Sequence, residues 1–451
     1  MHDTQIPSTP VGRQFAAWLA AFNSGDRSHL HQFLEANFPS MNLESHLGFR
    51  GRTGGFDLRA VEQATATTLT GLVQERDSDQ FARFAVEVEP AAPHRITHLT
   101  LAAIPRPGAF PIPRLREAEL VATLRAKVEK DAAADRFAGA VLLAKGGTVL
   151  FSGSYGLADR EQQVANTLDT RFRIGSMSKM FTAVSILQLV QAGAITLTDP
   201  LGTYLTEYPN ADVAARVTIH HLLTHTGGTG DIFGPEFHDH RLELRTLSDY
   251  VALYGQRALA FEPGSRWEYS NYGMLLLGVV IERVSGQSYY DYVAAHLYAP
   301  ADMVRSGSEP ESVAVLDRAT GYTRPRGGGA WIPNTATLPF RGTSAGGGYS
   351  TVGDLLRFAQ ALMGHRLLDA DYTTLLITGK VDSSQGRRYA YGFEDDRQDG
   401  AGAVGHSGGA PGMNGVLRIY PQSGYVVAAL ANLDPPAARR VAAFLDPRLP
   451  H

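Results

Sequence analysis

Ser176 and Lys179 most directly suggest chemistry, because their spacing places a hydroxyl and an amine one helical turn apart. In water neither group reacts readily, but a desolvated lysine can take the proton of a neighbouring serine and leave a nucleophilic oxygen. The pair therefore predicts a hydrolase that works through a covalent bond to Ser176. The alternative is a surface lysine beside a capping serine. Such a pair also arises by chance, so it needs partners elsewhere in the chain.

The apolar residues after Ser176 recur at helical spacing, and Gly193 is the expected end of the helix. They form one stripe, made of Met177, Met180, Phe181, Val184 and Leu187. Ser176 would then lie in the first turn, where free backbone N–H groups and the positive end of the helix dipole favour developing negative charge. Lys179, three residues later, would lie on the same face.

Tyr269 and Asn271 form a second candidate motif, which follows a Pro-Gly turn at 263–264 and precedes an apolar run at 274–281. This context predicts a loop that leads into a helix. A tyrosine close to a lysine ammonium can have its pKa lowered and can relay a proton to a leaving group. An asparagine can hydrogen-bond either the lysine or a substrate amide. The alternatives are a core tyrosine and a turn-forming asparagine.

His406 lies in a third candidate motif, the stretch Gly-His-Ser-Gly-Gly at 405–409, just before a strand-like segment at 415–420. Glycines allow a substrate to lie against the edge of a strand, and a backbone N–H there can face an oxyanion. The alternative is that His406 is a structural histidine in a glycine-rich loop.

The three motifs, in this order, resemble those of the serine β-lactamase and penicillin-binding-protein superfamily, specifically its class C and esterase-like branch. Residues 222–228 and 344–351 are also similar to stretches that recur in that branch. The resemblance covers residues 115–448 and is specific as a set. It implies a two-lobe hydrolase, in which an antiparallel sheet flanked by helices carries a helical lobe and the site lies between the lobes, with Ser176 at the sheet edge.

The resemblance also assigns roles to individual residues. Ser176 would be the acylated nucleophile, Lys179 its base, Tyr269 the second proton carrier, Asn271 a substrate-orienting amide, and His406, Gly408 and Gly409 part of the substrate-binding and oxyanion region. The N–H groups of Ser176 and Gly409 would form the oxyanion hole. No metal or other cofactor is expected in this chemistry.

The third motif departs from the Lys-Thr-Gly that lactamases and transpeptidases usually carry, because this chain has His406 at the first position. A permanent ammonium suits a substrate carboxylate, whereas histidine is mostly neutral near pH 7. We therefore expect an esterase or D-amino-acid peptidase that acts on small esters or amides, with weak or no β-lactamase activity. The alternatives are a true class C β-lactamase and a non-catalytic penicillin-recognition protein.

Composition excludes several other classes of function. The chain has 451 residues, 41 basic against 45 acidic, and a net charge of −4, without a basic run that would favour nucleic acid. There are no cysteines, which excludes disulfides and thiol catalysis. No apolar stretch is long enough to predict a membrane span. Several histidines could suggest a metal cluster, namely His220, His221, His225, His238 and His240, but their spacing fits no common zinc motif.

The N-terminal part follows a different pattern, with helices first and then strands. Pro10 starts an amphipathic helix that ends near Gly25, and a second helix carries Leu30 and Phe33. Strands are expected at 67–76, 80–88 and 94–101. This order predicts an α+β domain, and the arrangement resembles the NTF2/SnoaL-like cone. The role expected for it is an accessory one.

The expected fold class is therefore α/β, in its α+β form, with three segments. Residues 1–104 would form the cone-like domain, 105–114 a proline-rich linker and 115–451 the hydrolase domain, with its helical lobe at about 196–340. The expected partner is a small ester or amide, and the N-terminal domain is a candidate for homodimer formation. Residues 1–10 show no signal-peptide pattern. Since the superfamily is often exported, we expect a periplasmic or secreted protein whose signal lies outside this chain, with the cytoplasm as the alternative.

Overall fold

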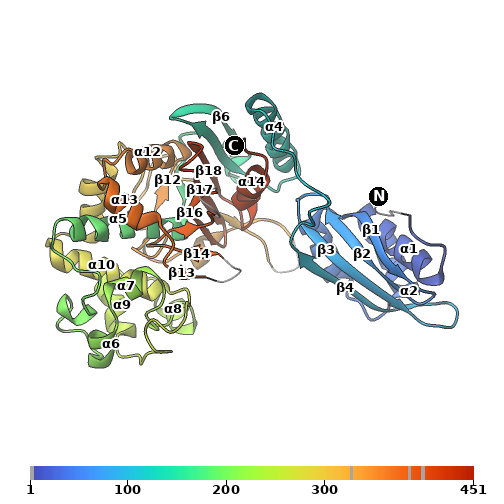
Figure 1. Cartoon of the computed structure of the whole chain (residues 1–451), viewed down its shortest axis with the longest axis horizontal. Coiled ribbons are helices and arrows are strands. Elements are labelled where there is room, and N and C mark those ends of the chain that lie inside the picture. The colour runs from blue at the N-terminus through green and yellow to red at the C-terminus, as the bar shows by residue number, and fades with distance from the viewer. Residues whose placement is uncertain (1–4, 326–328, 384–386, 398–401, 451) are drawn as a thin grey trace. The chain divides into compact units, whose positions relative to one another are not determined.

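The structure is a computed structural model of the chain, and it describes residues 5–325, 329–383, 387–397 and 402–450. Its internal contacts separate two compact units (Figure 1). The first is Met1–Pro113 with Arg324–Ala330, and the second is Arg114–Thr323 with Trp331–His451. Each unit has a hydrophobic core of its own.

The N-terminal unit packs three helices on a four-stranded antiparallel sheet whose strands pair in chain order. Its elements are α1 Pro10–Ser24, α2 Arg27–Asn37, α3 Leu43–Thr53, β1 Phe56–Ala64, β2 Thr68–Glu75, β3 Phe81–Val88 and β4 Ile96–Ile104. The first two helices and the last three strands confirm the sequence analysis. Two elements were not predicted, namely α3, which contains two glycines, and β1, where charges at Asp57, Arg59 and Glu62 interrupt the apolar pattern.

Aromatic stacking joins α1 to the sheet. Phe15, Trp18 and Phe22 are fully buried on one helix face, and the Phe15 ring stacks on Phe84 of β3 with centroids 4.2 Å apart. Pro10 occupies the first turn and Gly25 ends the helix in a left-handed conformation, as predicted. The unit thus has an α+β fold, with a layer of helices packed on a sheet. Its similarity to the NTF2/SnoaL-like cone stays a prediction.

The second unit is built on one eight-stranded antiparallel sheet with the order β13-β14-β15-β16-β17-β18-β5-β6. Its strands are β5 Gly139–Lys145, β6 Thr148–Tyr155, β13 Val381–Asp382, β14 Arg388–Tyr389, β15 Glu394–Asp395, β16 Val404–Ala410, β17 Met413–Ile419 and β18 Tyr425–Ala431. The expectation that the first hairpin and the last strands share a sheet is confirmed.

Helices cover both faces of this sheet. Side chains alternate along β18, so Ala428 and Leu430 face the core that contains α5 Ser178–Gln191 and α12 Val352–Met363. Val427 and Ala429 face the core that contains α4 Glu117–Ala133 and α14 Ala437–Leu445. The central strands are apolar on both sides for this reason.

The helical lobe shares the core of α5. Its helical elements are η2 Leu201–Thr203, α6 Ala211–Arg216, α7 Ile219–Leu223, α8 Pro235–His240, α9 Leu247–Tyr254, α10 Asn271–Ser285, α11 Tyr289–Val293 and η3 Ala294–Tyr298. Short elements complete the unit, namely β7 Leu157–Asp159, β8 Val164–Ala165, β9 Phe172–Arg173, η1 Gly175–Met177, β10 Tyr322–Thr323, β11 Ile332–Pro333, η4 Asn334–Thr337, β12 Tyr349–Ser350 and α13 Ala370–Ile377. Of the lobe predicted at 196–340, the part after Tyr298 is therefore mostly irregular.

Helix α5 differs from the expected amphipathic helix, because most of its polar residues are buried as well. Thr182 and Ser185 are fully buried. The Thr182 hydroxyl donates to the carbonyl of Ser344, and that of Ser185 to the carbonyl of Phe181. Satisfied hydroxyls of this kind allow a helix to be enclosed on all sides, so the expected single stripe understated its burial.

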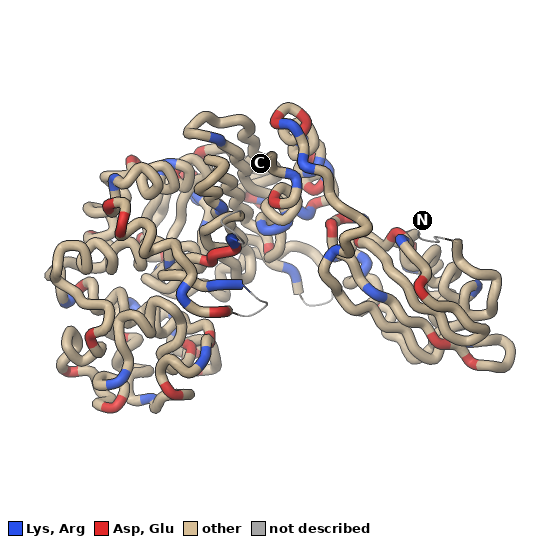
Figure 2. Tube along the Cα trace, in the orientation of Figure 1, with Lys and Arg blue, Asp and Glu red and all other residues tan. Residues whose placement is uncertain are grey.

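Charged residues of both signs are interspersed along both units, as Figure 2 shows. Within the described residues, no helix has the length and apolar character needed to cross a membrane.

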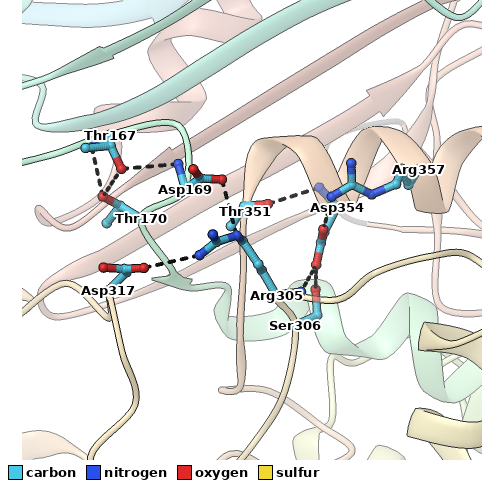
Figure 3. Close-up of polar contacts among 9 residues, drawn as sticks. All are labelled: Thr167, Asp169, Thr170, Arg305, Ser306, Asp317, Thr351, Asp354 and Arg357. Carbon is cyan, nitrogen blue, oxygen red and sulfur yellow. Dashed lines mark hydrogen bonds and ion pairs between the residues drawn. The ribbon is translucent and has the colours of Figure 1, made fainter.

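The start of α12 is held by a buried carboxylate, drawn in Figure 3. Asp354 is fully buried and accepts hydrogen bonds from the Arg305 backbone N–H at 2.8 Å, the Ser306 hydroxyl at 2.7 Å and the Arg357 guanidinium. Its own N–H donates to the Thr351 hydroxyl at 3.1 Å. This network fixes α12 just after β12, which pairs with the strand that leads to Ser176.

Replacing Asp354 should therefore destabilise the second unit. We expect Asp354→Ala to lower the free energy of unfolding by about 3 kcal/mol, because the change leaves buried donors without their acceptor. The matched control is Asp371→Ala, which removes an exposed aspartate from the first turn of α13 and should change stability by less than about 0.5 kcal/mol. Urea unfolding measures both, and equal effects of the two substitutions would contradict the role assigned to the network.

Candidate functional site

Ser176 lies in the tight turn η1, directly before α5. The turn needs glycine at Gly175, whose φ is +54°. It also needs glycine across from it on β16, since a Cβ at Gly408 would lie 1.9 Å from the carbonyl oxygen of Ile174. A Cβ at Gly175 would in turn lie 3.0 Å from the backbone nitrogen of Gly409. Small residues thus let the turn press against the strand.

Strand β16 offers an open edge at this point. Its neighbour β15 pairs only with Val404 and Gly405, so the residues from His406 to Ala410 lie beyond that pairing. Ser176, which was expected at the sheet edge, lies beside this half of β16, since a Cβ at Gly408 would lie 3.0 Å from the Ser176 backbone nitrogen. The loop location that the alternative interpretation gave to His406 is wrong, because this residue lies within β16.

Lys179 lies in the first turn of α5 and is fully buried. Its Nζ is 3.3 Å from the Ser176 Oγ and 2.7 Å from the Asn271 Oδ1, and it also donates to the carbonyl oxygen of Ala345. The structure therefore brings together the serine, the lysine and the asparagine that the sequence analysis singled out.

Burial lowers the pKa of Lys179 to about 7, because the charged form loses its hydration, while the negative charge of Asp231 partly opposes the shift. A sizeable fraction of neutral amine is then present near pH 7. Such an amine, in contact with a hydroxyl, is suited to accept its proton.

Asn271 begins α10, and Asp231 orients it. The Asp231 carboxylate accepts from the Asn271 backbone N–H at 2.9 Å and from its side-chain Nδ2 at 3.2 Å, which turns Oδ1 toward Lys179. The amide thus holds the lysine, one of the two possibilities considered above, while its contact with a substrate stays a prediction. Asp231 was missed, since it lies 40 residues from its partner and in no recognised motif.

Tyr269 lies in the loop before α10, where Ser270 caps the helix by accepting the Gly273 N–H. The Lys179 Nζ lies 4.6 Å from the centroid of the Tyr269 ring. Burial raises the pKa of the Tyr269 phenol, and its hydrogen bond with Ser176 opposes this. The expected lowering of this pKa is therefore wrong. The Lys179 amine lies near the ring, and the phenol stays protonated and able to donate.

Both ring nitrogens of His406 have partners within the protein. Nδ1 donates to the Ser407 carbonyl oxygen at 2.6 Å, and Nε2 accepts from the Tyr389 hydroxyl at 3.1 Å. Burial lowers the pKa of this imidazole. His406 is thus a neutral, enclosed side chain rather than a charged anchor for a substrate.

Tyr389 connects His406 to a second buried imidazole. The His225 Nε2 donates to the Tyr389 oxygen at 3.0 Å, and its Nδ1 accepts from the Ser270 N–H at 3.3 Å. The His225 ring also packs against Tyr269, with centroids 4.5 Å apart. The chain from His225 through Tyr389 to His406 therefore supports the loop that carries Tyr269. His225 belongs to a motif seen in the sequence, whereas no sequence signal marked Tyr389.

Two cavities meet at Ser176, and Gly409 lines both of them. The first has a volume of about 230 Å³ and a mostly apolar lining. The second, of about 270 Å³, is lined by polar and charged groups that include Tyr269, Glu394 and the exposed Arg439. Glu394 and Arg439 reach the site from β15 and α14, so their approach to Ser176 could not be read from local sequence.

Three of the histidines considered as metal ligands, His220, His221 and His240, have separate polar partners. The His220 Nδ1 bonds the Tyr391 hydroxyl at 2.9 Å, the His221 Nδ1 accepts from the Thr218 N–H, and His240 pairs with Glu243. Among the described residues, no three histidine, aspartate or glutamate side chains gather in a way that could hold a metal ion.

Comparison with known proteins gives a consistent result for the second unit. A family model described as Beta-lactamase matches residues 124–447. The crystal structure of a penicillin binding protein from Bacillus halodurans is 36% identical, with a TM-score of 0.65, over 71% of this chain and 98% of that chain.

Two further relatives carry names that describe an activity. Esterase EstB of Burkholderia gladioli is 32% identical over 288 residues, which cover 57% of this chain and 72% of the esterase. A D-stereospecific amidohydrolase from Streptomyces sp. is 27% identical with a TM-score of 0.60, over 73% of this chain and 98% of that chain.

The protonation of Lys179 should govern the reactivity of Ser176. Below a pH of about 7 the amine carries a proton and cannot accept another, so labelling of Ser176 by a fluorophosphonate should slow about tenfold per pH unit. Above that pH the rate should level off. Mass spectrometry of samples quenched at a series of times measures this profile.

A pair of lysine substitutions provides the control. Lys179→Arg keeps the charge but holds its proton at all accessible pH, so labelling should fall by at least about 10²-fold. Lys380→Arg changes a lysine whose Nζ bonds the carbonyls of Leu375 and Thr378, and it should leave the profile unchanged. A rate that stays constant between pH 5 and 9 would contradict the assigned base.

Proposed function

This chain belongs to the beta-lactamase family and is a serine hydrolase, and we propose that it cleaves small esters or amides through an acyl-enzyme on Ser176. One observation carries the proposal, namely the contact of the buried Lys179 Nζ with the Ser176 Oγ at 3.3 Å. A buried amine with a pKa of about 7 supplies the base that a serine nucleophile requires.

The proposed reaction begins when the Ser176 Oγ attacks the substrate carbonyl carbon and its proton passes to the Lys179 Nζ. The carbonyl oxygen becomes an oxyanion that the N–H groups of Ser176 and Gly409 stabilise. As the bond to the leaving group breaks, the Tyr269 phenol donates a proton to it and regains one from Lys179. Water then attacks the acyl-enzyme by the same route, which releases the acid and restores Ser176.

The third motif and the relatives support the proposed substrate class. His406 is neutral and both its nitrogens are occupied, so it provides no fixed cation for a lactam carboxylate. The names of the esterase and the amidohydrolase support esters and amides as substrates. We therefore propose an esterase or D-amino-acid peptidase type of activity.

A β-lactam is the second candidate substrate, because Arg439 lines the polar cavity and carries a positive charge. Its side chain is exposed, however, and Glu394 lines the same cavity. A solvated guanidinium that shares a cavity with a carboxylate binds an anion less firmly than a buried ammonium does.

A substrate panel tests the proposal. The panel contains p-nitrophenyl butyrate as the ester, D-alanine p-nitroanilide as the amide, and nitrocefin as the β-lactam. We expect kcat/KM for p-nitrophenyl butyrate to exceed that for nitrocefin by about 10²-fold or more. Ser176→Ala should lose about 10⁴-fold or more of the activity. The control Ser185→Ala, which removes a hydroxyl bonded only within α5, should retain it. Nitrocefin as the best substrate would favour the lactamase alternative, and the absence of both turnover and a fluorophosphonate adduct would refute the enzyme mechanism.

A further inference from the structure

We propose that the apolar cavity beside Ser176 binds the acyl group of the substrate, and that this acyl group is an uncharged hydrocarbon chain. The inference rests on the proposed function, because it names the part of the substrate that becomes attached to Ser176. It goes further in that it assigns the two cavities to the two halves of the substrate.

The lining of the apolar cavity comes from several separate parts of the second unit. Its main apolar side chains are Ile232, Phe233, Phe237, Leu338, Pro339 and Met413. Its described lining includes no lysine, arginine, aspartate or glutamate. The polar side chains in the lining, among them His238 and Asn271, carry no permanent charge, so a charged group placed there would lose hydration without a full counter-charge, whereas a hydrocarbon chain would leave water favourably.

The position of Tyr269 decides which half of the substrate enters which cavity. Tyr269 lines the polar cavity and is not part of the apolar lining. It is the phenol proposed to protonate the leaving group, so the leaving group must lie on its side of Ser176. The carbonyl lies between the two cavities, where Ser176 and Gly409 line both. The acyl chain would then occupy the apolar cavity.

Two neighbouring phenylalanines line the apolar cavity, and one of them reaches solvent. Phe237 is buried, and the Phe233 ring packs against it edge to face with centroids 5.2 Å apart. Phe233 itself is 62% exposed, which is unusual for so large an apolar side chain. A hydrocarbon chain that enters here would cover part of the exposed ring.

The length of the acyl chain should therefore affect the rate. Each methylene moved from water into an apolar site is worth roughly a fourfold gain in kcat/KM. A butyryl ester carries two more methylenes than an acetyl ester, so we expect roughly a 15-fold advantage for p-nitrophenyl butyrate over the acetate. The common leaving group keeps the polar side constant.

A matched pair of esters tests the requirement for an uncharged chain. The p-nitrophenyl ester of hexanoic acid and the mono-p-nitrophenyl ester of adipic acid have acyl groups of six carbons each, but the acyl group of the second ends in a carboxylate. We expect the adipate to react at least about tenfold more slowly. Equal rates for the pair, or a flat profile from acetate to hexanoate, would overturn the assignment of the cavity.

A matched pair of variants tests the place of binding. Phe233→Ser removes the exposed ring from the cavity lining and should lower the hexanoate-to-acetate ratio of kcat/KM about threefold to tenfold. Leu316→Ser removes another exposed apolar side chain, 77% exposed and outside the cavity lining, and should leave that ratio unchanged. The same ratio in both variants would show that the chain binds elsewhere.

The fluorophosphonate adduct separates failure of this inference from failure of the proposed function. If Ser176 forms the adduct while the acyl series is flat, the nucleophile is correct and the acyl cavity is wrong. If Ser176 forms no adduct and no ester is cleaved, the proposed function itself fails and the cavity assignment falls with it.

Discussion

The burial of the Lys179 amine is the constraint on which the rest of the site depends. An ammonium removed from water is costly, so the surroundings must either supply partners or favour the neutral amine. Here both occur, since the Asn271 Oδ1 and the Ala345 carbonyl accept hydrogen bonds and the ring of Tyr269 faces Nζ. The balance leaves the pKa of Lys179 at about 7.

These partners come from distant segments, and other parts of the fold hold each of them. Asp231 orients Asn271, while the buried chain of His225, Tyr389 and His406 supports the loop of Tyr269. Buried polar chains of this kind are rigid because every member is hydrogen-bonded. They hold the lysine and the phenol at fixed positions around the Ser176 hydroxyl, which is the geometry that serine catalysis needs.

Local sequence predicted the parts of the fold and site that depend on spacing. The turn of Ser176 and Lys179, the loop before α10 and the terminal strands all follow from residues close together in the chain. What spacing could not predict depends on burial and long-range contact. The raised pKa of Tyr269, the occupied nitrogens of His406 and the approach of Asp231 are examples. Likewise, β1 was missed because its stability comes from pairing with β2 rather than from an apolar pattern.

We propose that Ser176 is the nucleophile and that it lies between an apolar acyl cavity and a polar leaving-group cavity. A crystal structure of the protein after reaction with p-nitrophenyl butylphosphonate tests this most directly. We expect phosphorus bonded to the Ser176 Oγ, a phosphoryl oxygen at the N–H groups of Ser176 and Gly409, and the butyl chain beside Phe237 and Leu338. Phosphorus on another residue, or a butyl chain in the cavity of Glu394 and Arg439, would contradict it.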